Sequence, residues 1–323
     1  MPASSRVVRV AAVQAAPAFL DRAATLDRLE EWAKRAASEG ARVIAFPETW
    51  VPGYPAWLDD SPGSALWGHE GAKAVFARLF DNSLEVPGPE TERLGKLARA
   101  LKATLVVGVH ERAGRTLYNS LLTFGPDGVL ANHHPKLMPT YHERLVWGLG
   151  DGRGLTAVEV NGARVGGLIC WEHWMPLARQ VMHDAGEEIH VAAWPGVPDM
   201  HQVASRHYAF EGRCFVVAVG QILRVRDLPP ELPPRPEKAK DPDGFLYRGG
   251  SCVIAPTGRI IAGPVLDEET IVLADCDLSE IVRESLTLDV SGHYSRPDLF
   301  DLRFQPRATA QDGLTTAPPR SPK

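Results

Sequence analysis

The sequence predicts an α/β fold, because short apolar strands alternate with amphipathic helices along its first third. Residues 7–14 are apolar and rich in valine, as buried strands are. An amphipathic helix is expected over residues 21–38, and Gly40 stands where a helix terminator belongs. The apolar run 43–46 completes a strand–helix–strand unit, which is typical of a sheet with helices packed on it.

The later elements follow from the same two patterns. Pro89 opens a second amphipathic helix that leads to a strand at 105–109. Two hairpins are predicted, 117–124 with 129–133 around a Pro-Asp-Gly turn and 155–160 with 163–169 around an Asn-Gly turn. Further strands are expected at 189–194, 215–219, 251–255, 260–261 and 271–275, and further helices at 201–212 and 278–286.

Proline and glycine mark the loops but do not divide the chain. Residues 227–243 hold six prolines among charged residues, so we expect an extended surface loop there. Residues 305–323 are polar and proline-bearing, and we expect a disordered tail. Strand signals continue on both sides of each loop. The prediction is one domain over residues 1–304, with strands enough for two sheets.

Composition excludes several classes of protein. The chain has 323 residues, and 35 Lys+Arg against 40 Asp+Glu give 35 − 40 = −5, a poor basis for sequence-independent nucleic-acid binding. No run approaches the 18 or so apolar residues of a membrane span, and residues 1–6 show no signal-peptide core. The four cysteines form no CxxC pair, which argues against a zinc site or a disulfide scaffold. We therefore expect a cytoplasmic protein with reduced cysteines.

Three segments place a reactive residue beside the end of a predicted strand. Glu48 follows the strand at 43–46, where α/β proteins often form sites, although a solvated loop charge is the simpler reading. Lys136 and Glu143 lie in a segment that an ordinary charged loop would also explain. Adjacent histidines at 133 and 134 would point to opposite faces of a strand, which argues against a metal site.

Cys170 stands at the third strand end, just before helical signals begin near Pro176. Backbone N–H groups and a helix N-terminus at such a turn favour a thiolate, whereas a buried structural cysteine is the alternative. The combination is more specific than its parts. A thiol, an ammonium and two carboxylates at strand ends form a plausible acyl-transfer site, with the cysteine as nucleophile.

These segments together resemble the nitrilase superfamily of carbon–nitrogen hydrolases, over nearly the whole chain. The three motifs that carry the resemblance are Phe-Pro-Glu48, His-Pro-Lys136-Leu with Pro-Thr-Tyr-His-Glu143, and Cys170-Trp-Glu-His with Pro176 and Arg179. The nucleophile motif, with segments 147–152, 248–251 and 292–298, looks like the true nitrilase branch, which includes cyanide-converting enzymes.

The resemblance implies a four-layer α-β-β-α sandwich and homodimers that extend into larger oligomers or spirals. It implies hydrolysis of an organic nitrile to a carboxylic acid and ammonia through a covalent Cys170 intermediate, with amide as a possible by-product. Glu48 would move the protons, Lys136 would stabilise the developing charge, and Glu143 would orient the lysine. Neither a metal nor an organic cofactor is required. An amidase of the same superfamily is the nearest alternative, and a catalytically silent scaffold is the alternative from another class.

Aromatic residues gather in and beside the motif segments. We expect them to line a pocket for an apolar or aryl-bearing nitrile, although packing or interface burial would also explain them. The residues assigned to substrate contact are Tyr54, Tyr141, Trp147, Trp171 and Trp194.

Overall fold

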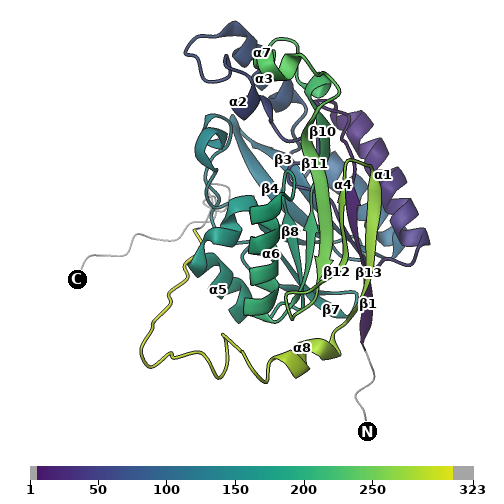
Figure 1. Cartoon of the computed structure of the whole chain (residues 1–323), viewed down its shortest axis with the longest axis vertical. Helices are drawn as coiled ribbons and strands as arrows, with labels where there is room; N and C mark the ends of the chain where they lie inside the picture. Colours follow the sequence, from purple (N-terminus) through teal and green to yellow (C-terminus); the bar gives the residue numbers. More distant parts are fainter. Residues whose placement is uncertain (1–5, 308–323) are drawn as a thin grey trace.

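A computed structural model of the chain describes residues 6–307 (Figure 1). The helices are α1 (Arg22–Ser38), α2 (Trp57–Asp60), α3 (Glu70–Asp81), α4 (Pro89–Leu101), α5 (Pro176–Asp184), α6 (Asp199–Gly212), α7 (Pro236–Ala239) and α8 (Ser279–Glu284). Short 3₁₀ helices are η1 (Tyr141–Leu145), η2 (Cys170–Trp174) and η3 (Val225–Asp227).

The strands form two sheets. The first has the order β13-β1-β2-β3-β4-β5, from β1 (Val7–Gln14), β2 (Val43–Ala45), β3 (Thr104–Ala113), β4 (Thr116–Phe124), β5 (Leu130–Pro135) and β13 (Thr270–Asp277). The second has the order β10-β11-β9-β8-β7-β6, with β12 on β11, from β6 (Val158–Val160), β7 (Ala163–Ile169), β8 (Ile189–Ala193), β9 (Phe215–Val219), β10 (Ile222–Arg224), β11 (Phe245–Ile254) and β12 (Ile260–Leu266).

Side-chain alternation along the strands places the two sheets face to face. On β1, Val8, Val10 and Ala12 belong to a core shared with β7, β8 and β9, whereas Ala11 and Val13 pack with α1 and α4. Helices α5 and α6 cover the outer face of the second sheet (Figure 1). The expected α-β-β-α sandwich is confirmed.

Local sequence accounts for the main helices. The side chain of Asp21 caps α1 by accepting from the N–H of Ala24, and α4 begins with proline. Leu26 and Leu29 of α1 and Leu94 of α4 lie on the faces turned to the first sheet.

The 227–243 loop differs from the prediction. It contains the short helix α7, and it is not wholly on the surface. Leu228 and Leu232 are buried in a third apolar cluster with Trp57, Val75 and Leu79 of α2 and α3, because two leucines among the prolines give the loop an apolar anchor. Helix α3 itself was not predicted.

Two expectations concern the ends of the chain. The expected disordered tail, residues 305–323, lies outside the described residues apart from 305–307, and the N-terminal segment 1–6 lies outside them apart from Arg6. No helix within residues 6–307 combines the length and the apolar composition needed to cross a bilayer.

Candidate active site

Three strand ends converge between the two sheets. Glu48 follows β2, Lys136 follows β5, and Cys170 follows β7 of the facing sheet. The side chains of all three are buried, with at most 3% of each residue exposed. The structure therefore brings together residues that are up to 122 positions apart in the sequence, since 170 − 48 = 122.

A glycine on the neighbouring strand makes room for the Glu48 turn. A Cβ at Gly108 of β3 would lie 2.1 Å from the carbonyl oxygen of Pro47 and 2.9 Å from the carbonyl carbon of Glu48. Only a residue without a side chain lets the backbone pass this closely. The turn is then held by hydrogen bonds to its main chain, from Gln221 Nε2 to the Glu48 carbonyl (3.0 Å) and from Glu48 N–H to the Trp194 carbonyl (3.3 Å).

The ammonium of Lys136 joins two carboxylates. Its Nζ donates to Glu48 Oε1 and to Glu143 Oε2, both at 2.7 Å. Glu143 also accepts from the hydroxyl of Tyr54 (2.7 Å) and from the N–H of Thr140 (2.6 Å). Glu143 is thus fully hydrogen-bonded and holds the lysine in place.

Glu48 has one occupied and one open oxygen. Oε1 accepts from Lys136 and from Asn119 Nδ2 (2.7 Å), whereas Oε2 is buried with no hydrogen-bond partner among the described residues. The Sγ of Cys170 lies within 4.8 Å of a carboxylate oxygen of Glu48 and of Glu143. One oxygen of Glu48 is therefore available to exchange a proton with a group beside the thiol.

Burial sets the protonation of these groups. Burial raises the pKa of Glu48 to about 7, and the nearby charge of Glu143 adds to the rise against the opposing effects of Lys136 and Asn119. Burial also raises the pKa of the Cys170 thiol well above its usual value, and the charge of Glu48 raises it further. Of the two alternatives that the sequence left open, a thiolate and a buried cysteine, the burial of Cys170 favours a thiol that keeps its proton. The nucleophile needs a base, and Glu48 is the ionisable neighbour with a pKa near neutrality.

The lysine stays charged in this setting. Burial alone lowers the pKa of Lys136, but the adjacent charges of Glu48, Cys170 and Glu143 outweigh it, so the net pKa is raised. The donor atoms of Glu48, Glu143 and Cys170 are close enough together for a metal ion. The Lys136 ammonium, however, already bridges the two carboxylates and repels a second cation. The donor set therefore fits proton transfer better than metal binding.

A cavity of about 790 Å³ opens onto Cys170. Its wall includes three of the five aromatic residues assigned from the sequence, Tyr54, Tyr141 and Trp171. Other apolar side chains around it are Leu58, Met138, Trp174, Met175 and Tyr247. Charged side chains, among them Asp59, Glu143 and Arg144, complete the wall. A cavity that combines apolar walls with a few polar groups beside a nucleophile suits a small organic substrate.

Trp147 and Trp194 do not belong to the cavity wall. The indole of Trp147 lies behind Lys136, with Nζ 5.7 Å from the ring centroid, and it donates to His110 Nδ1 (3.0 Å). Trp194 is fully buried, and its ring stacks on His173 at a centroid distance of 4.6 Å. Both residues pack around the site, and their assignment to substrate contact stays a prediction that the lining of this cavity does not support. Their position in the sequence did not reveal which side of the strand end each faces.

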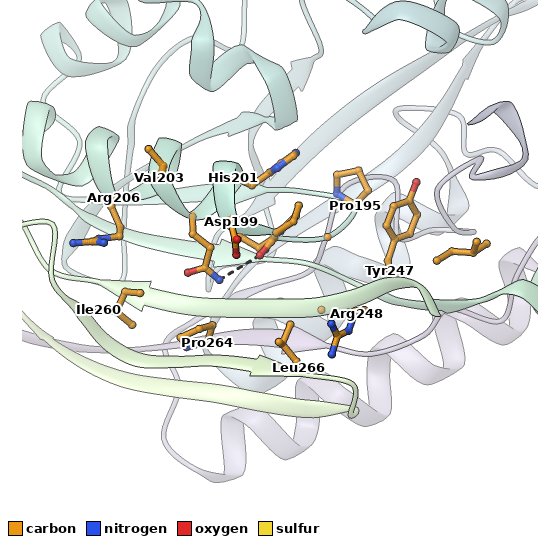
Figure 2. Close-up of a pocket in the computed structure, with 16 residues that line it drawn as sticks. Pro195, Asp199, His201, Val203, Arg206, Tyr247, Arg248, Ile260, Pro264 and Leu266 are labelled. Atoms are coloured by element: carbon orange, nitrogen blue, oxygen red, sulfur yellow. Dashed lines mark hydrogen bonds between the residues drawn. The ribbon is translucent and has the colours of Figure 1, made fainter. Parts of the chain in front are cut away.

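A second cavity of about 580 Å³ lies beside the first (Figure 2). The two share Pro195, His201 and Tyr247 as a common wall. Arg206 and Arg248 border the second cavity, but each donates to a partner, Gly258 O and Asp267 respectively. Cys170 and Glu143 line the first cavity and not the second.

Comparison with known proteins decides the family. The family model described as carbon-nitrogen hydrolase matches residues 9–283. The chain belongs to the carbon–nitrogen hydrolase family. It is 40% identical over 317 residues to a protein named bifunctional nitrilase/nitrile hydratase NIT4A from Lupinus angustifolius, a match that covers 96% of this chain and 89% of the relative. It is 42% identical over 294 residues to an aliphatic nitrilase from Sinorhizobium fredii, which covers 91% of this chain and 94% of the relative.

Solved structures of carbon–nitrogen hydrolases share the fold. XC1258 from Xanthomonas campestris superposes with a TM-score of 0.67 at 19% identity, covering 88% of this chain and 96% of that one. Nit3 from Saccharomyces cerevisiae gives 0.66 at 18% identity, covering 90% and 97%.

Sequence reasoning missed two polar residues of this carbon–nitrogen hydrolase site. The side-chain amide of Asn119, on β4, donates to Glu48, and its main-chain carbonyl accepts from the N–H of Lys136 (2.7 Å). Glu172 accepts from His134 Nε2 (2.9 Å) and from the N–H groups of Leu137 and Ile169 (both 2.7 Å). It therefore ties the lysine segment to the cysteine segment. A buried polar residue inside an apolar strand was the available signal for Asn119, whereas Glu172 gave no signal beyond its place in the motif.

Proposed function

We propose that this chain is a nitrilase that hydrolyses an organic nitrile to a carboxylic acid and ammonia. The single observation that carries the proposal is that the Cys170 thiol lies beside the carboxylate of Glu48, whose Oε1 accepts a hydrogen bond from Lys136. The named nitrilases among its relatives, at about 40% identity over most of the chain, support the nitrile as substrate. Glu48, Lys136 and Cys170 are the proposed catalytic residues.

The first step forms a covalent thioimidate. As the Cys170 sulfur bonds to the nitrile carbon, its proton passes to Glu48, because the buried thiol does not ionise by itself. One π bond of the nitrile breaks, and its electron pair goes to the nitrogen. Lys136 and the N–H of Trp171 stabilise that charge, and Glu48 returns the proton to the nitrogen.

Two waters complete the reaction. The first, deprotonated by Glu48, adds to the thioimidate carbon to give a tetrahedral intermediate. Glu48 passes that proton to the nitrogen, and as the new hydroxyl gives up its own proton and becomes the thioester carbonyl, ammonia leaves. The second water, deprotonated by Glu48, adds to the thioester carbon, the carbon–sulfur bond breaks, and Glu48 returns the proton to the Cys170 sulfur as the acid is released. If the intermediate expels the sulfur instead, the product is an amide. The relative from Lupinus angustifolius is named for both activities, which supports amide as a by-product here.

Further residues orient the proposed catalytic side chains. Glu143 orients Lys136, and Tyr54 in turn holds Glu143. Tyr54, Tyr141 and Trp171 are the proposed contacts for the substrate's carbon skeleton, since they line the cavity at Cys170. An apolar or aryl-bearing nitrile fits this lining.

We also propose that the enzyme is a cytoplasmic homo-oligomer. All four cysteines are free thiols, as a reducing compartment would leave them. Apolar side chains on α5 and α6 lie exposed on the outer face, namely Leu177, Met200, Val203 and Phe210. Such a face favours contact with a second copy of the chain. Light scattering on the purified protein measures the assembly.

The test is a substrate panel. The protein is incubated with aliphatic nitriles, aryl nitriles, arylacetonitriles and the matching amides, and ammonia, acid and amide are quantified. We expect ammonia and acid from nitriles with the wild type and none with Cys170→Ala. A matched Cys214→Ala variant, which alters a cysteine of the second sheet's core, should remain active. Turnover of amides alone would show an amidase instead, and no turnover with either class would favour the silent scaffold.

A further inference from the structure

A row of buried polar side chains runs from the main chain of Cys170 through His173 and His190 to Glu187 and Tyr208. His173, Glu187, His190 and Tyr208 are 2%, 5%, 0% and 0% exposed, and the proposed reaction uses none of them. They come from η2, the turn before β8, β8 itself and α6. Because burying ionisable groups is costly unless they are paired, the row needs an explanation beyond filling space.

Hydrogen bonds connect the row to the nucleophile. Nδ1 of His173 lies 2.7 Å from the carbonyl oxygen of Cys170, and its Nε2 lies 2.9 Å from Nε2 of His190. Nδ1 of His190 lies 2.7 Å from Glu187 Oε2, and the hydroxyl of Tyr208 donates to Glu187 Oε1. The chain therefore starts at the main chain of Cys170 and ends at a buried carboxylate.

These contacts fix where the protons are. A carbonyl oxygen only accepts, so Nδ1 of His173 carries hydrogen. Burial lowers the pKa of His173 well below its usual value, and His190 lowers it further, so the ring is neutral and its Nε2 accepts. His190 must then donate from Nε2.

The other nitrogen of His190 faces the Glu187 carboxylate. Burial by itself raises the pKa of Glu187, but His190 and His183 outweigh it and hold the net pKa below the usual range. An ionised carboxylate only accepts, so Nδ1 of His190 donates as well. Both ring nitrogens of His190 therefore face acceptors, the Nε2 of His173 on one side and the Glu187 carboxylate on the other, and this arrangement leaves His173 a single tautomer.

The sequence makes room for the pair. Gly166 of β7 lies opposite His190 in the parallel register, and a Cβ there would come within 2.4 Å of Glu187 Oε2. A glycine at this position lets the carboxylate lie against the strand that carries Cys170 at its end.

The carbonyl that accepts from His173 belongs to the peptide bond between Cys170 and Trp171. Cys170 has a φ of +50°, a conformation that a residue with a side chain adopts only at a cost. A planar trans peptide points the carbonyl of Cys170 and the N–H of Trp171 in opposite directions. Fixing the carbonyl therefore fixes the direction of that N–H.

We propose that His173 is a positioning residue for the reaction, because its Nδ1–H holds the peptide that joins Cys170 to Trp171. The His190–Glu187 pair keeps His173 in the tautomer that can do this. The inference rests on the proposed function, in which the N–H of Trp171 stabilises the charge on the substrate nitrogen and then on oxygen. Loss of the contact should lower kcat more than it changes KM, since this donor acts mainly in the transition state.

The test separates hydrogen bonding from packing, because His173 also stacks on Trp194. In His173→Asn the amide nitrogen takes the place of Nδ1, whereas His173→Leu keeps comparable bulk without a donor. We expect kcat on the best nitrile within about threefold of wild type for Asn, and roughly 10- to 100-fold lower for Leu with a similar KM. Equal kcat for the two variants, both folded by thermal melting, would overturn the proposal.

A second pair of variants covers the case in which His173→Leu does not fold. His190→Gln keeps an N–H near the position of Nε2, and His190→Leu removes it. Gln should retain at least several-fold more kcat than Leu, and equal losses would overturn the proposal. His207→Leu, on the exposed side of α6 with a 58% exposed side chain, is the control expected to match wild type.

The outcome for the wild type distinguishes this inference from the proposed function. If the wild type hydrolyses nitriles and the paired variants behave alike, only the positioning role fails. If the wild type hydrolyses amides alone, the nitrile assignment fails. The same paired comparison is then made on the amide, whose oxyanion would use the same N–H.

Discussion

At the scale of single residues, burial and neighbouring charges set the pKa values of the groups around Cys170. The buried Cys170 thiol holds its proton, and the pKa of Glu48 is raised to about 7. A base with a pKa near the operating pH is efficient both in taking a proton and in returning it. Lys136 keeps its charge because the adjacent charges of Glu48, Cys170 and Glu143 raise its pKa.

The raised pKa of Glu48 predicts the acid side of the pH profile. A general base must be ionised, so kcat/KM should fall as pH drops through about 7. Asn119 donates to the ionised form and so lowers this pKa. In Asn119→Leu the acid limb should therefore move to higher pH, by roughly one unit.

The measurement is kcat/KM between pH 5 and 9 for both proteins, with Asn132→Leu as a control. Asn132 lies on the next strand, β5, and donates to the Gly154 carbonyl, away from Glu48. If kcat/KM of Asn119→Leu falls at the same pH as that of the wild type, the ionisation that sets the acid limb belongs to a group other than Glu48.

At the scale of elements, Glu172 links the two halves of the site. It accepts from the segment after β5 and from the end of β7, so one side chain sets the spacing of Lys136 and Cys170. Burial raises the pKa of Glu172, but His134 and the two N–H donors outweigh it and the net pKa is lowered. The ionised form therefore stabilises the fold.

Glu172→Gln should destabilise the protein by about 2–4 kcal/mol at pH 7, because an amide offers one acceptor oxygen where the carboxylate offers two. The stabilisation by Glu172 is present above its unfolded pKa of about 4.5 and is lost as pH falls through the lower folded pKa. The difference between the two proteins should therefore shrink at acid pH.

Urea unfolding at pH 7 and at pH 4 measures this difference. Glu159→Gln, at an exposed position of β6, provides the control. A difference in unfolding free energy that is the same at both pH values would contradict the role of the charge.

Prediction of elements from the sequence succeeded where local signals were strong. Valine-rich β1, the capped helix α1 and the turn-marked hairpins β4–β5 and β6–β7 followed from periodicity and turn residues. Helix α3 and the buried anchor at Leu232 were missed, because their burial depends on contacts between α2, α3 and the distant loop 227–243. No local pattern reports such contacts.

At the scale of the whole molecule, the site exists only where the two sheets meet. The motifs predicted three candidate catalytic residues, each of which stands at a strand end, and the structure places them close together. Their assembly depends on strand order, which places β2 and β5 in one sheet and β7 in the other. The burial of Trp147 and Trp194 behind the cavity wall, and the partners of Asn119, also depend on that order and could not be predicted from spacing.

A core shared between the sheets predicts cooperative unfolding of residues 1–304 as one domain. Side chains from both sheets pack in one cluster that includes Cys170. Far-UV circular dichroism, tryptophan fluorescence and activity should therefore be lost together in urea, at two protein concentrations. A plateau in one signal between two transitions would indicate separately folding parts.

The central claim is that Cys170 forms a covalent intermediate with a nitrile. Intact-mass spectrometry of the protein quenched with acid during turnover of a slow nitrile tests it most directly, with peptide mapping to locate the adduct. We expect a thioimidate or thioester mass increase on the peptide that contains Cys170, and none with Cys170→Ala. Continued turnover with no adduct on the wild type, or an adduct of the same size on Cys170→Ala, would contradict the claim.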